Sequence, residues 1–106
     1  MFALKRRKQA GPLAGGDLRA YLFRPSPDVA VATREGRAVL LDVRRERYYG
    51  LDEVGTTIWE GLQQGLTFTE IVDSLEGEYD APRPMLEEDV SRFVARLASS
   101  NLVVQS

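Results

Sequence analysis

VLLDVRRERYYGL spans residues 39–51, and DEVGTTIW follows it directly at residues 52–59. The first segment holds two β-forming runs, residues 39–43 and 47–51, on either side of a polar turn. Such a pattern predicts two antiparallel strands joined by a short turn. The second segment opens with an aspartate, a residue that commonly caps a helix. A β-hairpin that runs directly into a helix is therefore predicted.

A further strand is predicted upstream of this hairpin. Valine and threonine alternate with alanine over residues 29–33, and Glu35 and Gly36 then supply a turn. Three short strands at this spacing form an antiparallel meander.

Three helices are predicted downstream. The first begins after Asp52 and ends at Gly65. The second opens with a capping box at Thr67 and Glu70. The third follows a break at residues 80–84, and its apolar stripe is Leu86, Val90, Val94 and Leu97. Strands followed by helices predict an α+β domain, winged-helix-like, with the helices on one face of the sheet.

Single residues and composition predict where the domain begins and where it ends. Asn101 suits the left-handed position that ends a helix, and residues 102–104 are expected to return as a short strand. Residues 1–24 contain a basic cluster with glycine and proline, so they are expected to form a flexible basic extension before a domain at residues 25–106.

Composition restricts the function. The 106 residues include no cysteine and no histidine, which removes disulfides, thiol catalysis, the commonest metal ligand and the usual general base. We therefore expect no enzyme activity, no metal and no cofactor. The absence of cysteine suits a reducing compartment, so a cytoplasmic protein is expected. No apolar run is long enough to span a membrane.

Charge is distributed unevenly and bears on partners. Residues 1–50 carry 11 Lys and Arg against 5 Asp and Glu, whereas residues 51–106 carry 3 against 11. Binding of duplex DNA by the third helix is disfavoured because Glu87, Glu88 and Asp89 occupy its expected first turns. Their placement there is explained by the positive end of the helix dipole, without any metal site.

Capture of an extended peptide is the remaining function class. A sheet of three short strands has open edges, and an edge can receive a peptide as an extra strand. Tyr48 and Tyr49 point to opposite faces of their strand, so one should pack towards the helices and the other remain available. Proline in place of Tyr49 is expected to remove a strand N–H and weaken such binding.

The chain from about residue 29 to residue 104 resembles PqqD-like proteins. The matching segments are residues 39–42, 47–51, 54–59, 70–75 and 87–94 with the closing Leu-Val-Val. The resemblance implies a small non-catalytic protein, a RiPP recognition element, that holds the leader segment of a ribosomally made precursor peptide. A partner maturation enzyme, of protease or radical SAM type, would then modify the core peptide.

The resemblance also implies where the leader binds. It would pair antiparallel to the third strand and lie between that strand and the third helix. Carried over by position, the peptide-binding residues are Arg47, Tyr48, Tyr49, Gly50, Leu51, Met85, Asp89, Arg92, Phe93 and Arg96. Tyr48 or Tyr49, Leu51 and Phe93 are expected as apolar walls, with the charged residues at the rim.

Two alternatives stay open on sequence grounds. One is a winged-helix nucleic-acid binder, and the other is a structural subunit that buries the strand edge in a partner or in its own dimer. The pathway is also open, because lasso peptides, quinone cofactors and radical-modified peptides all use such elements.

Overall fold

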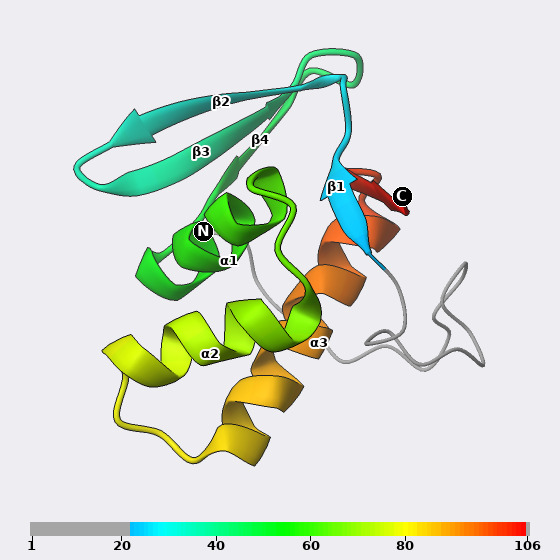
Figure 1. Cartoon of the computed structure of the whole chain (residues 1–106). Coiled ribbons are helices and arrows are strands. Elements are labelled where there is room, and N and C mark those ends of the chain that lie inside the picture. The colour runs from blue at the N-terminus through cyan, green and yellow to red at the C-terminus, as the bar shows by residue number, and fades with distance from the viewer. Residues whose placement is uncertain (1–21, 106) are drawn as a thin grey trace.

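The computed structural model describes residues 22–105. Figure 1 shows a three-stranded sheet on one side of the molecule and all three helices on the other. In chain order the elements are β1 (Phe23–Pro25), β2 (Val29–Arg34), β3 (Arg37–Asp42), β4 (Arg47–Gly50), α1 (Glu53–Gln63), α2 (Phe68–Glu78), α3 (Arg83–Ser99) and β5 (Val103–Gln105). The predicted α+β fold is confirmed, although its likeness to a winged helix is loose.

The expected basic extension lies, as far as Tyr21, outside the described residues. Phe23 and Arg24, which the sequence placed in that extension, instead form β1 together with Pro25.

The meander is antiparallel with the strand order β2-β3-β4, as predicted. Arg34 and Arg37 pair across the β2–β3 turn, whose central residues Glu35 and Gly36 have φ of 54° and 79°. Two central residues with positive φ are typical of hairpin turns that match the strand twist. Ala38, whose side chain is buried, begins the inward-facing row of β3 that packs towards the helices.

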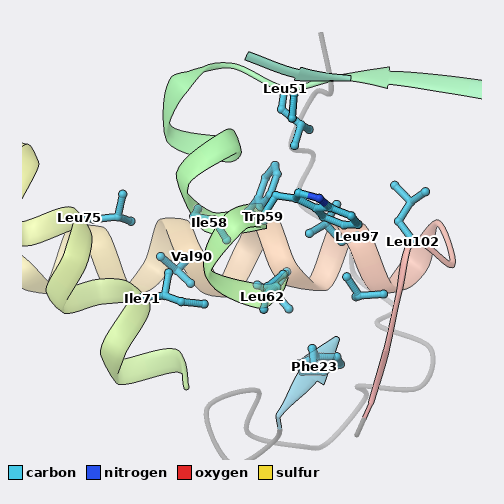
Figure 2. Close-up of a cluster of buried hydrophobic side chains, with 14 of the residues drawn as sticks. Phe23, Leu51, Ile58, Trp59, Leu62, Ile71, Leu75, Val90, Leu97 and Leu102 are labelled. Carbon is cyan, nitrogen blue, oxygen red and sulfur yellow. The ribbon is translucent and has the colours of Figure 1, made fainter. Parts of the chain in front are cut away.

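A second, two-stranded sheet was not predicted. The expected C-terminal strand is present as β5, and its antiparallel partner is β1, with Phe23 opposite Gln105. The Phe23 side chain is only 5% exposed and belongs to the main core, where it points towards the helices (Figure 2). The chain preceding the meander therefore closes one end of the core, next to the end of α3.

Helix boundaries follow the predicted caps closely. The Asp52 carboxylate accepts a hydrogen bond from the Gly55 N–H at 2.8 Å, and Gly65 has a φ of 79° just after the end of α1. At α2 the Thr67 hydroxyl and the Glu70 carboxylate each accept a hydrogen bond from the other residue's backbone N–H. Each of these side chains satisfies a donor that the helix itself leaves unpaired.

The prediction for the start of α3 was wrong. Arg83 and Pro84 were assigned to a break, but the helix begins at Arg83, with Pro82 as its N-cap. A proline in the first turn costs nothing there, because the N–H that it lacks would have no helical partner.

The acidic residues of α3 consequently lie beyond its first turn and are held by arginines. Glu87 pairs with Arg83 at 3.4 Å, and Glu88 and Asp89 both approach Arg92. Arg83 also bridges to α2, because it lies 2.9 Å from both Asp73 and Glu76. The hydrogen bond to Asp73 raises the pKa of Arg83, against the effect of desolvation. Ion pairs, rather than the helix dipole, account for this charge pattern.

The core is built around α1, as predicted from its apolar stripe. Trp59 is fully buried and Ile58 is 1% exposed, and Figure 2 shows Trp59 between Leu51 and Leu97. The indole N–H of Trp59 finds no hydrogen-bond acceptor among the described residues. Its contribution to stability is therefore expected to come from apolar contact area.

Replacing Trp59 separates contact area from hydrogen bonding. Trp59→Ala should lower the free energy of unfolding by about 3–5 kcal/mol, because it leaves a cavity in the core. Trp59→Phe should cost less than half as much, since it keeps most of the ring and removes the unpaired donor. Urea unfolding measures both values. Equal losses would show that the indole N–H has a partner that matters.

Two helical glycines give a matched pair for the packing of α1 on α2. A Cβ at Gly61 would lie 2.8 Å from Cγ1 of Ile71, whereas a Cβ at Gly77 would meet nothing within 4 Å. Gly77→Ala should stabilise the protein by about 0.5–1 kcal/mol through helix propensity. Gly61→Ala should instead destabilise it by about 1–3 kcal/mol through overpacking. Similar unfolding energies for the two variants would contradict this close contact.

Candidate peptide-binding edge

Strand β4 is an edge strand of the meander. It pairs with β3 on one side, from Val39 opposite Gly50 to Asp42 opposite Arg47. Within residues 22–105 no strand pairs with its other side. The backbone groups on that side are therefore available to a further strand.

The hydrogen-bond pattern identifies which groups face the open edge. The Leu51 N–H donates to the carbonyl of Ala38 at 2.9 Å, so the pair that continues the ladder beyond Gly50 is hydrogen-bonded. Antiparallel pairs alternate between hydrogen-bonded and non-hydrogen-bonded. The Tyr49 N–H therefore points towards β3, while those of Tyr48 and Gly50 point outwards.

This geometry corrects the reasoning about proline at Tyr49. A proline there would break the bond between β3 and β4 instead of removing a donor from the open edge. The sequence showed that the N–H groups alternate in direction along the strand. It did not show which of them point outwards, because that depends on which residue of β3 lies opposite. Tyr48 and Gly50 are the positions whose N–H groups could bind a peptide.

The two tyrosines divide between the faces as predicted. Tyr49 lies opposite Leu40 and packs against the core, whereas Tyr48 lies opposite Leu41 and is 75% exposed. Tyr48 is thus the available aromatic side chain of β4, on the face of the sheet turned away from the helices.

A buried carboxylate holds the turn that leads into β4. The Asp42 side chain is 1% exposed and accepts hydrogen bonds from the backbone N–H of Arg45 at 3.0 Å and from its guanidinium at 3.3 Å. Glu46 completes the turn with a φ of 55°. Burial alone would raise the pKa of Asp42, but the hydrogen bonds and the charge of Arg45 hold it below its ordinary value of 3.8.

Asp42 was not predicted as a residue of the site. It was visible only as the end of a β-rich run, although an aspartate three residues before Arg45 is a recognisable turn signal. Its burial depends on the alternation that places Ala38, Leu40 and Asp42 on the face covered by helices.

Because the pKa of Asp42 is lowered on folding, the carboxylate stabilises the fold above pH 3.8, and this contribution disappears as pH falls through the folded-state pKa. Asp42→Asn should therefore be less stable than the wild type near neutral pH and approach it in acid. Urea unfolding between about pH 7 and pH 2.5 tests this. Asp28→Asn is the control, since the ion pair of Asp28 within residues 22–105 is with an exposed Arg44. A difference independent of pH would contradict the role of the charge.

Leu51 and Phe93 are both buried members of the core cluster. A Cβ at Gly55 would lie 3.1 Å from the Phe93 ring, so α3 passes close to the first turn of α1, directly after β4. With exposures of 3% and 4%, both Leu51 and Phe93 are core residues.

The remaining residues assigned to the third helix lie on one side of α3. Met85, Asp89, Arg92 and Arg96 follow one another at spacings of four, three and four residues. Arg92 is bound within the helix by Glu88 at 2.8 Å. Asp89 and Arg96 flank Phe93, whereas Met85, which is 55% exposed, lies about 12 Å along the helix from it.

Phe93 thus lies beside the first turn of α1, which directly follows Gly50 and Leu51, and Asp89 and Arg96 flank Phe93 along α3. Arg47 and Tyr48 are exposed at the other end of β4, and Met85 is the outlying member of the predicted set.

No group of three or more potential metal-ligating side chains lies together within residues 22–105. None of the helices in this part of the chain has the length and apolar character needed to cross a membrane.

Comparison with known proteins identifies the family. Residues 37–103 match the family described as coenzyme PQQ synthesis protein D (PqqD). The chain belongs to the PqqD family. No curated protein sequence matches it.

Several solved structures share the fold. A structure described as TbiB1 in complex with the TbiA(beta) leader peptide is 38% identical, with a TM-score of 0.73, over 76% of this chain and 93% of that one. A lasso peptide synthetase B1 complexed with the leader peptide is 28% identical, with a TM-score of 0.74, over 78% and 98%.

The third structure is the PqqD truncation of Methylobacterium extorquens PqqCD, described as a stand-alone RiPP recognition element. It is 25% identical, with a TM-score of 0.64, over 77% of this chain and 87% of that one.

Proposed function

We propose that this PqqD-family protein binds the leader segment of a ribosomally synthesised precursor peptide and presents it to a maturation enzyme. The observation that carries the proposal is the open edge of β4, where the N–H groups of Tyr48 and Gly50 face outwards. Two of the similar structures are complexes with leader peptides. The leader adds to β4 as an antiparallel fourth strand, joined by backbone hydrogen bonds.

Specificity must come from side chains, because backbone pairing attracts many sequences. A strand added to β4 directs alternate side chains to the two faces of the sheet. Those on the inner face meet Tyr49 and the α3 residues around Phe93, and those on the outer face meet Tyr48. The region of Asp89, Arg92 and Arg96 forms the rim on α3.

The protein acts as a non-catalytic adaptor in this proposal. A chain without cysteine or histidine lacks the usual nucleophile and general base, so the chemistry belongs to the partner. That partner is a maturation enzyme of protease or radical SAM type, and the adaptor needs no cofactor of its own. Its role is to raise the local concentration of the precursor at the enzyme.

Nucleic-acid binding is the less favoured alternative. The exposed surface of α3 carries Glu87, Glu88 and Asp89, and its Arg83 and Arg92 are already held by carboxylates. A recognition helix needs basic or amide side chains that are free to reach phosphates and base edges. The ion pairs of α3 therefore favour peptide binding over duplex binding.

Proline and alanine at Tyr48 test the binding edge. Tyr48→Pro removes an outward N–H, while Tyr48→Ala removes the side chain and keeps that N–H. Pro is tolerated at an edge position whose N–H faces solvent, so both variants should fold. Tyr48→Pro should weaken binding of the TbiA(beta) leader peptide at least about tenfold relative to Tyr48→Ala, because proline removes one hydrogen bond and its ring clashes with the added strand.

Isothermal titration measures the affinities, and amide shifts in labelled protein locate the peptide. Shifts centred on α2, with β4 unchanged, would place the site elsewhere. Equal affinities of the two variants would contradict pairing through the Tyr48 N–H.

A further inference from the structure

An open hollow of about 290 Å³ lies at the end of the sheet where β4 leaves β3. Strand β3 begins at Arg37, two residues before its first pairing with β4 at Val39. Beyond Gly50 the chain makes one more bond to β3, through Leu51, and then turns into α1. The hollow lies beside the start of β3, where the chain has turned away from the sheet into α1.

Two arginines line this hollow without a counter-ion. Arg34 and Arg37 lie directly opposite each other in the β2–β3 register, and both are exposed. Among residues 22–105, neither forms an ion pair, whereas Arg44, Arg45 and Arg83 each have a carboxylate partner. Like charges directly opposite on neighbouring strands destabilise a sheet, so this pair costs stability in the free protein.

The acidic residues of the hollow do not neutralise the pair. Asp52 accepts a hydrogen bond from the Gly55 N–H as the N-cap of α1, where the helix dipole favours its charge. Glu35 lies at the turn between the two arginines, but its carboxylate makes no ion pair with either. Room therefore remains for an external anion between Arg34 and Arg37.

The hollow is accessible from the proposed binding edge. Arg34, Arg37, Val39 and Gly50 belong to the same face of the sheet, because they occupy paired positions two residues apart. Gly50 has no side chain to separate the hollow from a strand added beside β4. Such a strand would lie about 10 Å from Arg37 in β3 and about 14 Å from Arg34 in β2, two and three strand spacings away. An extended arginine and a glutamate joined by a hydrogen bond can span the longer distance, and the shorter one with less extension.

We propose that Arg34 and Arg37 bind the carboxylate of an Asp or Glu side chain from the peptide strand added to β4. This inference rests on the proposed function and adds a specificity determinant to it. In antiparallel pairing, the peptide residues that reach Gly50 precede those that reach Arg47. The acidic residue is therefore the one paired with Gly50, or the one two positions before it, at the N-terminal end of the bound segment.

The test uses the full chain and two forms of the TbiA(beta) leader peptide, one unchanged and one with every Asp and Glu replaced by Asn and Gln. R34Q/R37Q should weaken binding of the unchanged peptide about threefold to tenfold at low salt. The neutralised peptide should bind the wild type with a similar loss and show no further loss with R34Q/R37Q. R24Q/R44Q, which removes two arginines away from the hollow, should change affinity less than about twofold.

The outcomes separate this inference from the proposed function. The anion site is wrong if R34Q/R37Q and R24Q/R44Q lower the affinity equally. It is also wrong if neutralising the peptide lowers its affinity for R34Q/R37Q as much as its affinity for the wild type. Peptide-induced amide shifts at Tyr48 and Gly50 in R34Q/R37Q would meanwhile show that the edge still binds. The variant should also be at least as stable to heat as the wild type, because it removes a repulsion.

A tetraglutamate peptide probes the hollow without any leader. It should shift the amides of Gly36, Arg37 and Gly50 in the wild type and leave them unchanged in R34Q/R37Q. Absence of these shifts would overturn the proposal even if the leader binds. Equal shifts with inorganic phosphate at the same concentration would indicate a general anion site and overturn the assignment to a peptide carboxylate.

Discussion

The backbone of Ala38 joins the sheet to the helices, and the geometry of the site depends on it. Its carbonyl accepts the Leu51 N–H at 2.9 Å, and its N–H donates to the hydroxyl of Thr56 in α1 at 2.9 Å. The first bond sets the phase of the β3–β4 ladder, and the second holds the start of α1 against the same residue. Both bonds are shielded from water, because Ala38 and Thr56 are buried. Buried bonds of this kind are costly to break.

This junction explains why the end of β4 is suited to recognition. A short edge strand of four residues is a modest aggregation hazard, since its unpaired groups are few. Asp42 anchors one end of it through Arg45, and Asp52 caps the helix at the other. The strand is therefore presented in a defined position with little conformational freedom left to lose on binding. Such preorganisation increases affinity without additional contacts.

The acidic and basic residues, which are unevenly distributed along the chain, also lie in different parts of the fold. Five of the seven carboxylates of α2 and α3 form ion pairs with Arg83 or Arg92. Arg34 and Arg37, in contrast, are exposed at the β2–β3 turn and form no ion pair within residues 22–105. The basic excess is thus available to a partner, whereas much of the acidic excess is used within the fold. Uncompensated charge at one end of the sheet also fits a role in steering a charged peptide.

Local signals in the sequence determined most of the secondary structure. Asp52, the Thr67–Glu70 capping box and the positive-φ positions at Gly36 and Asn101 mark their elements because each acts within a few residues of chain. The apolar stripe of α1 likewise predicted the burial of Ile58 and Trp59. The boundary error at Arg83 arose because proline is compatible with the first turn of a helix as well as with a break.

Only the tertiary structure decided the features that join distant residues. The pairing of Phe23 with Gln105 spans nearly the whole described chain, and three-residue strands carry too weak a local pattern to predict a partner. The direction of the N–H groups of Tyr48 and Gly50 depends on their register against β3, which alternation alone leaves undetermined. Among the predicted site residues, the family resemblance supplied the positions, but the burial of Leu51 and Phe93 follows from the packing of α3 on α1. Residue types and spacings act locally, whereas exposure and hydrogen-bond direction arise when separate elements meet.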